Sequence, residues 1–289
     1  MSRVAIIADT TVQMTPEMAR EHGIRLVPLH VIIDGKCWAE NEVDLDWFYR
    51  EMPRWKESGH LPSTSSPSVG DFLAAYDELR REAEAVLYIA LSPKFSNTFN
   101  SGLQATKRAE TETPGVPFKI VNTLTACGGQ MLIAIAASRV GVTGSLPEVV
   151  SLAEDLAKKT SYISLSDDLY YLAKGGRIHE GRSWVGSRVA NTVLLEADYA
   201  TGGVNKPLGR YKTQRQAIEA LFKIVRARSG RRALHVAINH AGAPAEAQAL
   251  KEQALSHFNC AEIYVTPLLP LVTIHNGPGA LKFSWWAET

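Results

Sequence analysis

The sequence lacks a dominant charge of either sign. Its 289 residues carry 31 Lys and Arg against 30 Asp and Glu, which gives a formal net charge of +1. Proteins that bind nucleic acid through its phosphates are usually strongly basic, at least over one face. No nucleic-acid module or aromatic platform accompanies the basic residues here, so nucleic acid is not an expected partner.

Cysteine is also scarce. The chain has three cysteines, Cys37, Cys127 and Cys260, which lie far apart and form no C-x-x-C pair. An odd number at this spacing fits neither a disulfide framework nor a zinc site. We therefore predict no metal and no cofactor, and a reduced, cytoplasmic location.

Long apolar runs are missing as well. The longest one, residues 131–137, is far shorter than the roughly 20 residues that cross a bilayer. The run at residues 4–8 is too short for the core of a secretory signal. No membrane span is expected, and contact with a membrane would be transient.

Three motifs of common enzyme classes are absent. The sequence has no Walker A loop, no G-x-G-x-x-G after its first strand and no G-x-S-x-G elbow, which disfavours a self-contained nucleotide enzyme. Asp9, Ser96 and His275 could still form a hydrolase triad, and an esterase-type hydrolase is kept as a second hypothesis. It ranks below binding, because Ser96 lies in a setting typical of a helix cap and a hydroxyl without a base acts as a hydrogen-bond donor.

What the sequence does contain is a regular alternation of strand-like and helix-like segments. Residues 4–8 and 86–91 are uninterrupted apolar runs, typical of parallel strands buried on both faces. We predict an α/β fold with a parallel, doubly wound sheet in residues 1–158 and a second, mixed α/β domain in residues 159–289. The other predicted strands span residues 24–33 (in a hairpin with 36–38), 118–122, 161–165, 193–197, 204–206, 235–239, 261–265 and 271–274. The predicted helices span residues 15–23, 45–52, 69–85, 99–109, 130–140, 146–159, 214–228 and 243–258. The most apolar helix, 130–140, is either core or the wall of an apolar tunnel.

Two loops carry hydroxyl side chains just before predicted helices, at Thr64–Ser68 and at Ser92–Thr98. In the first, Ser66 is the predicted N-cap and Pro67 the first helical residue. Hydroxyls and free backbone N–H groups at a positive helix end bind anions. If the two loops converge at the carboxyl ends of the sheet, they would hold a carboxylate or a phosphate; otherwise they are two separate caps.

Two further features bear on function. His275 is predicted at the end of strand 271–274, before Gly-Pro-Gly, where its imidazole could donate to an anion or act as a base. The second half is locally basic, which indicates either a solvated surface or a docking face for an acidic partner. A regulatory, partner-binding module is therefore a third hypothesis. The basic residues are Lys174, Arg177, Arg182, Arg188, Lys206, Arg210, Lys212 and Arg215.

Six short motifs, in order along nearly the whole chain, resemble those of the DegV family of bacterial fatty-acid-binding proteins. Three departures accompany them: Ser66 replaces a family Gln, Asn97 and Asn276 replace a Gly and a Thr, and residues 190–193 lack a family Lys-Pro. The motifs are Asp9-Thr10-Thr11, Val27-Pro28-Leu29, Thr64–Ser68, Phe95–Phe99, Leu169–Ile178 with its Lys-Gly-Gly-Arg, and His275–Ala280.

The resemblance implies a carrier that is not itself an enzyme and has no catalytic residue. It implies one long-chain fatty acid in a buried tunnel, with the carboxylate held by hydroxyls of Thr64 and Ser96 near His275. The bound acid would be presented to a separate, dihydroxyacetone-kinase-like fatty acid kinase subunit for conversion to acyl-phosphate. The implied ligand-binding residues are Thr64, Ser65, Ser96, Asn97, Thr98, His275, Asn276 and Gly277, and the implied docking residues are Lys174, Arg177 and Arg210.

Overall fold

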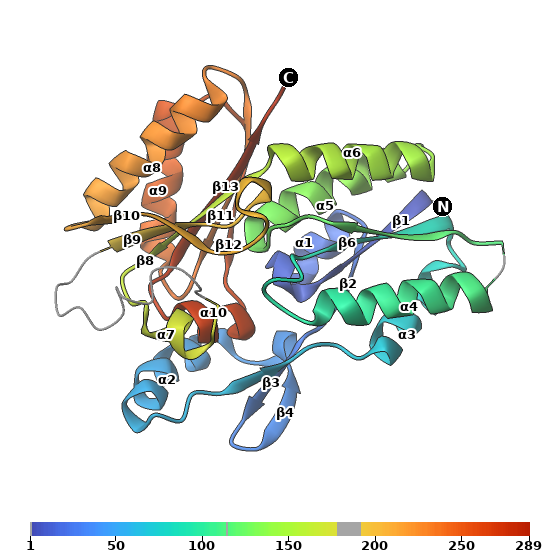
Figure 1. Ribbon diagram of the computed structural model, residues 1–289, viewed down its shortest axis with the longest axis horizontal. Helices are drawn as coiled ribbons and strands as arrows, with labels where there is room; N and C mark the ends of the chain where they lie inside the picture. Colours follow the sequence, from blue (N-terminus) through green and yellow to red (C-terminus); the bar gives the residue numbers. More distant parts are fainter. Residues whose placement is uncertain (1, 114, 178–191) are drawn as a thin grey trace.

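The computed structural model describes residues 2–113, 115–177 and 192–289 (Figure 1). Its first half contains a four-stranded sheet in the order β2-β1-β6-β7, in which all neighbours are parallel. This confirms the predicted doubly wound parallel sheet. The strands are β1 (Ser2–Asp9), β2 (Ile24–Val27), β6 (Ala83–Ala90) and β7 (Phe118–Asn122).

Helices cover both faces of this sheet, which explains the uninterrupted apolar runs of its two central strands, β1 and β6. Val4 and Ile6 pack in one core cluster with α5 and α6, whereas Ile7 packs in another with α3 and α4. Successive residues of β1 thus enter opposite cores, as strand geometry requires. The helices are α1 (Pro16–Glu21), α3 (Val69–Leu79), α4 (Thr98–Glu112), α5 (Cys127–Gly141) and α6 (Leu146–Lys159).

The second half contains a six-stranded sheet in the order β10-β9-β8-β13-β11-β12. Among these described strands β11 and β12 pair in parallel and the other neighbours pair antiparallel, so the sheet is mixed, as predicted. Helices α8 (Gln214–Ser229) and α9 (Pro244–His257) cover one face. The strands are β8 (Ser161–Ser166), β9 (Thr192–Glu196), β10 (Lys206–Tyr211), β11 (Leu234–His240), β12 (Cys260–Pro267) and β13 (Leu281–Ala287).

Helix α5 lies between the two large sheets (Figure 1) and packs against β1, β11 and β13. Eleven of its 15 residues are buried. A Cβ atom on Gly128 would lie 2.7 Å from the Cβ of Ala237 on β11, so the glycine permits this close approach. Of the two roles that the sequence left open for residues 130–140, these contacts support a place in the core. The domain boundary at residue 158 stays a prediction, because α5 joins both halves.

A small sheet in the order β4-β3-β5 completes the fold, with α2 (Leu45–Ser58) packed against it. The single strand predicted at 24–33 is wrong: it breaks at Pro28-Leu29, and β2 and β3 enter different sheets. Proline has no backbone N–H to donate to a ladder, which favours a break there. The predicted hairpin is confirmed by the pairing of β3 (His30–Ile33) with β4 (Lys36–Ala39), and β5 spans Ser63–Ser65.

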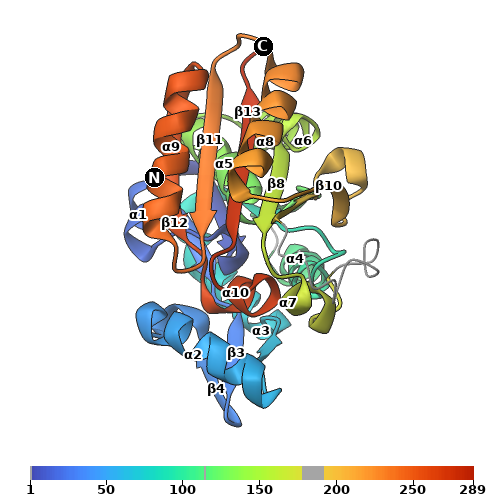
Figure 2. The ribbon, with the colours of Figure 1, turned by 90° about the vertical axis from the view of Figure 1, so that its left-hand side faces the viewer.

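The end of the chain corrects another prediction. Residues 271–274 are not a strand but part of α10 (Pro270–Asn276), and the last strand is β13. Pro270 occupies the first helical position, and the backbone N–H of Leu271 donates to the buried Glu40 carboxylate at 3.1 Å. Figure 2 shows α10 between the mixed sheet and the small sheet with α2.

Smaller differences concern the ends of elements. Helix 69–85 ends at Leu79, because residues 83–85 join β6, and helix 45–52 continues to Ser58. The remaining elements within the described residues are α7 (Tyr170–Lys174) and the short 3₁₀ turns η1 (Thr10–Val12), η2 (Glu40–Glu42) and η4 (Tyr199–Thr201). Arg182, Arg188 and residues 190 and 191 lie outside the described residues.

Candidate functional site

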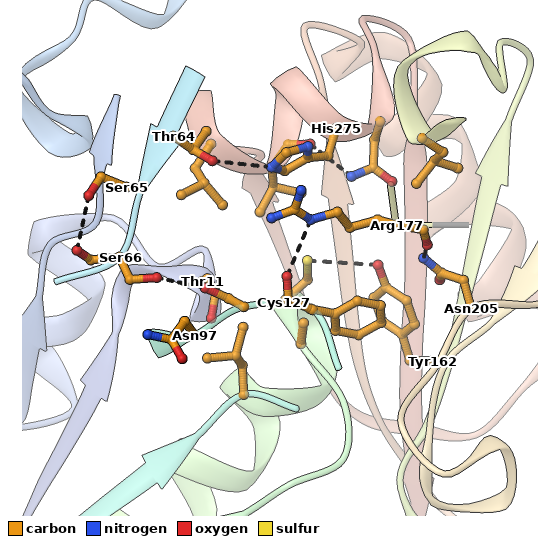
Figure 3. Close-up of a pocket in the computed structure, with 18 residues that line it drawn as sticks. Thr11, Thr64, Ser65, Ser66, Asn97, Cys127, Tyr162, Arg177, Asn205 and His275 are labelled. Carbon is orange, nitrogen blue, oxygen red and sulfur yellow. Dashed lines mark hydrogen bonds between the residues drawn. The ribbon is translucent and has the colours of Figure 1, made fainter. Parts of the chain in front are cut away.

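A cavity of about 190 Å³ lies where the loops after β1 and β6 meet β5, α7 and α10 (Figure 3). Its lining combines hydroxyl, nitrogen-bearing and apolar side chains from both halves of the chain. The lining residues are Thr11, Thr64, Ser65, Ser66, Leu91, Phe95, Ser96, Asn97, Ala126, Cys127, Tyr162, Leu172, Arg177, Asn205, Leu271, Val272, His275 and Asn276.

One side of the cavity, which we term the hydroxyl wall, consists of Thr64, Ser65, Ser66 and Ser96. The hydroxyls of Ser66 and Ser96 lie 3.1 Å apart and share a hydrogen bond. Ser96 is also bonded to the hydroxyl of the buried Thr98, at 2.8 Å, and accepts from its backbone N–H at 3.2 Å. The two serine- and threonine-containing loops therefore converge on the cavity and are not two separate caps.

The local structure of the first loop differs from the prediction. The N-cap of α3 is Ser68, which exchanges hydrogen bonds with Asp71 in a capping box, so Ser66 and Pro67 are not the cap and the first helical residue. The side chain of Asp71 decides this, because it can return the bond only to Ser68. Thr64 is positioned by strand β5, where it pairs with Val31 of β3.

The facing side, which we term the nitrogen wall, consists of Arg177, His275 and Asn276. His275 lies in the last turn of α10, and its Nε2 is 3.4 Å from the Thr64 Oγ1, a contact that joins the two walls. Burial, reinforced by the Arg177 guanidinium, lowers the pKa of His275 to about 3. The imidazole is therefore neutral at pH 7 and can donate one proton or accept one.

Arg177 supplies the charge of the cavity. Its guanidinium donates to the backbone carbonyl oxygens of Phe95, at 3.3 Å from Nε, and of Gly175. Burial lowers its pKa, but a guanidinium remains protonated in proteins. None of the described lining residues is Asp or Glu, so the cavity favours an anion.

Asn276 lines the cavity, but both ends of its amide are engaged. Its Nδ2 donates to the carbonyl of Val272 at 2.8 Å, and its Oδ1 accepts from the Lys282 ammonium. Gly277 ends α10 at a φ of 81°. A Cβ atom there would lie 2.4 Å from the Tyr171 ring. Gly277 is thus required by the backbone and is not among the lining residues.

The other predicted residues fall into different places. Asn97 lines the cavity and is the N-cap of α4, whereas Thr98 lies behind Ser96 and is fully buried. Lys174 at the end of α7 and Arg210 on β10 are exposed and lie outside the lining. Of the three predicted docking residues, Arg177 is the one that reaches the cavity.

Sequence reasoning missed most of the apolar lining and several polar residues. Thr11 had a usable signal, because it follows β1 at the carboxyl end of the sheet, where sites gather in this type of fold. Cys127 and Tyr162 have none, since they come from different elements and meet only in the folded chain. The Tyr162 hydroxyl donates to the Cys127 sulfur at 3.8 Å.

The candidate hydrolase residues are not connected among the described residues. Asp9 is buried and accepts hydrogen bonds from Thr11, from Tyr88 at 2.7 Å and from Gln130 at 3.0 Å. His275 contacts Thr64 rather than Ser96, and no side chain of the described residues bonds to its Nδ1. In the part of the chain that the structure describes, no group of three or more metal-ligating residues is present, and no helix is long and apolar enough to cross a membrane.

Comparison with known proteins extends these observations. A sequence model described as "uncharacterised protein, DegV family" matches residues 3–288. The chain is 28% identical over 287 residues to protein DegV of Bacillus subtilis, covering 98% of each chain.

Solved structures agree with the sequence match. The fold is similar to that of a DegV family protein of Thermus thermophilus described for its fatty acid binding. The TM-score is 0.89 and the identity 26%, over 99% of this chain and 100% of that chain. A Thermotoga maritima protein described as revealing a fatty-acid-binding function gives a TM-score of 0.85 and 27% identity, over 100% of both chains.

Proposed function

The chain belongs to the DegV family, and from that premise we propose that it binds a long-chain fatty acid in the cavity between the hydroxyl and nitrogen walls. The observation that carries the proposal is the composition of the lining. Hydroxyls and a guanidinium lie beside apolar side chains, and no described lining residue is acidic. An amphiphile with one anionic end fits this arrangement.

The carboxylate is placed at the two walls. A carboxylate that leaves water must be hydrogen-bonded, or the cost of its transfer exceeds the gain from the chain. Thr64 and Ser96 offer hydroxyl donors, and Arg177 offers N–H groups with a full positive charge. His275, neutral at pH 7, can donate from Nε2 in one tautomer, in place of its contact with Thr64.

The acyl chain is placed against the apolar part of the lining, where each buried methylene contributes about 0.8 kcal/mol. The cavity of about 190 Å³ is smaller than the roughly 300–1,000 Å³ of pockets that enclose drug-sized ligands. It therefore holds the head group and the first part of the chain, and a full long chain requires the apolar side chains to separate. These side chains are Leu91, Phe95, Ala126, Leu172, Leu271 and Val272.

The position of the hydroxyl wall supports a carrier role. Ser65 of this wall and the adjacent Asn97 are exposed, so a carboxylate at this wall stays near the surface while its chain is covered. We propose that a dihydroxyacetone-kinase-like subunit phosphorylates it there: a carboxylate oxygen attacks the γ-phosphorus of ATP, giving acyl-phosphate and ADP. The exposed Lys174 and Arg210 are proposed to contact that partner.

Catalysis by the chain itself is less well supported. Ser96 shares its hydroxyl with Ser66 and Thr98, and no described base is hydrogen-bonded to it. An activated serine needs such a base within hydrogen-bond reach. The proposal therefore treats Ser96 as a hydrogen-bond donor to the ligand.

The first test is the lipid content of the purified protein. We expect mass spectrometry of the denatured recombinant chain to find co-purified fatty acid, and the delipidated chain to bind oleate or palmitate. The ratio of the affinities for laurate and for dodecanol, an alcohol of the same chain length, measures the contribution of the carboxylate. A folded, lipid-free preparation that also refuses added oleate and palmitate would contradict the proposed function.

A further inference from the structure

A lysine lies buried directly behind the nitrogen wall. Lys282 of β13 is 1% exposed. Its Nζ donates to the Ser164 hydroxyl at 2.8 Å and to the Asn276 amide oxygen. The ammonium also lies 5.4 Å from the centre of the Tyr162 ring. Among the described residues, these contacts are all with neutral groups.

No carboxylate of the described residues forms an ion pair with Lys282, although buried ammonium groups are normally paired with one. Two of its three contact residues, Asn276 and Tyr162, line the cavity. Cys127 lines it too, and the Lys282 charge lowers the pKa of its thiol, against the larger effect of burial. The place next to this cation where an anion can enter is thus the cavity itself.

We propose that Lys282 is the buried counter-charge of the cavity, a specificity-determining residue that makes it select carboxylates over neutral amphiphiles of the same length. The inference rests on the proposed function and names a residue that does not line the site. Lys282 acts in two ways. Its charge acts through a region of low dielectric, where the field of an ion is weakly screened. Its bond to Oδ1 also fixes the amide of Asn276 in the wall.

The surroundings of Lys282 predict how binding depends on pH. Burial lowers the pKa of Lys282 to about 8, and an anion in the cavity must raise it again. The titratable groups that face it are Tyr162 from β8 and Cys127 from α5, and burial raises the pKa of both. The other facing groups are the amides of Asn239 from β11 and Asn276 from α10, which carry no charge. In the cavity His275 stays neutral and Arg177 stays charged above pH 7.

The acid should therefore bind with uptake of a proton near pH 8. Its affinity should fall as the pH rises above about 8, where the free protein loses the ammonium proton. A fatty alcohol of the same length carries no charge, so its affinity should not follow this change. Comparing the affinities of the two ligands therefore separates the effect of the Lys282 charge from the effect of its packing.

The test compares laurate with dodecanol at pH 7 in Lys282→Met, which keeps the length of the side chain and removes the charge. We expect the affinity for laurate to fall about tenfold or more and that for dodecanol to change less than about twofold. Lys223→Met, at an exposed position on α8, removes the same charge far from the cavity and should change neither. If Lys282→Met keeps the wild-type preference for laurate, the inference is wrong.

A measurement on the wild type decides the matter if the variant does not fold. Calorimetric titration with laurate near pH 8, in two buffers of different ionisation enthalpy, should show proton uptake, and dodecanol should show none. A laurate affinity that is constant from pH 7 to 10, without proton uptake, would overturn the inference. A wild type that binds neither laurate nor a longer acid would instead contradict the proposed function.

Discussion

The hydroxyl wall and the nitrogen wall face the same cavity, yet they are held in different ways. Thr64 and Ser96 belong to short segments of the first half, and their hydroxyls are partly exposed and bonded to one another or to neighbours. Arg177 and His275 come from the second half, where burial lowers the pKa of both. Neutral hydroxyls adapt to a ligand at little cost, whereas nitrogen groups depend on how well their surroundings tolerate a charge.

This difference separates two properties of the site. Hydroxyls accept or donate hydrogen bonds at any physiological pH, so the first wall is expected to supply geometry. The second wall and Lys282 behind it are expected to supply the preference for a negative charge, and Lys282 is expected to supply the dependence on pH. Substitutions in one wall at a time separate the two roles, and the largest effect is expected at the charged group that lines the cavity.

Replacement of Arg177 should have the largest effect on affinity. Arg177→Met removes the charge at the cavity and the bonds to the Phe95 and Gly175 carbonyls. Because hydrogen bonds to charged groups contribute about 1.5–3 kcal/mol, we expect laurate to bind roughly 10- to 100-fold more weakly. Fluorescence or calorimetric titration measures this loss.

The matched control for Arg177→Met is Lys212→Met, at an exposed position beyond β10. It changes the net charge equally and should leave the affinity for laurate unchanged. An equal loss of laurate affinity in both variants would show that binding responds to net charge alone, and would contradict a direct contact between Arg177 and the carboxylate.

Replacement of Ser96 should have an intermediate effect. Ser96→Ala removes the hydroxyl that joins the two loops of the hydroxyl wall through Ser66. We expect about a tenfold loss for laurate, because one hydrogen bond to a carboxylate is lost, and a smaller loss for dodecanol. The laurate affinity should keep its dependence on pH, since Lys282 is untouched. Ser151→Ala, at an exposed position on α6, is the control; equal losses for acid and alcohol would argue against carboxylate recognition.

The smallest effect concerns the stability that His275 contributes. Unfolded chains protonate histidine near pH 6.5, whereas the pKa of His275 in the folded chain is about 3. Stability from this group is therefore present above pH 6.5 and is lost as the pH falls toward 3. Between pH 7 and 5.5 the loss should be about 1 kcal/mol.

The variant His275→Gln isolates the contribution of His275 to the free energy of unfolding. The buried Glu40, whose pKa is raised to about 7, changes stability with pH in the opposite direction, but it does so equally in both proteins. Urea unfolding at the two pH values gives the difference between wild type and variant. If both proteins change equally, His275 does not titrate as the structure implies.

Local signals in the sequence were sufficient for much of the fold. The helix predicted from Leu146-Pro147-Glu148 to about Lys159 matches α6, because Pro147 marks its first turn; in the structure Ser145 and Glu148 also form a capping box at its start. The apolar runs of β1 and β6 likewise identified a parallel sheet covered on both faces. In these places each element has a beginning or a period that its own residues specify.

Where a segment is compatible with two local structures, the sequence could not decide between them. Ser66 and Ser68 are both acceptable caps two residues apart, and the side chain of Asp71 selects Ser68. Residues 271–274, which are mostly apolar and β-branched, favour a strand by themselves. Tertiary contacts make them helical instead, because Pro270 starts α10 and the backbone N–H of Leu271 donates to the buried Glu40 carboxylate.

The sequence by itself determined the alternation of strands and helices over most of the chain, though not β5, α10 or β13. It also identified Thr64, Ser96 and His275 as candidates, because hydroxyls before helices and a histidine before Gly-Pro-Gly can be recognised along the chain. Only the tertiary structure decided what lies behind them. In β13, Leu281 and Phe283 alternate with Lys282 and Ser284, a pattern of one buried and one solvated face. Here α5 covers the second face, so a lysine that would otherwise lie in water is enclosed beside the cavity. Burial depends on which elements meet in space, and no segment encodes that alone.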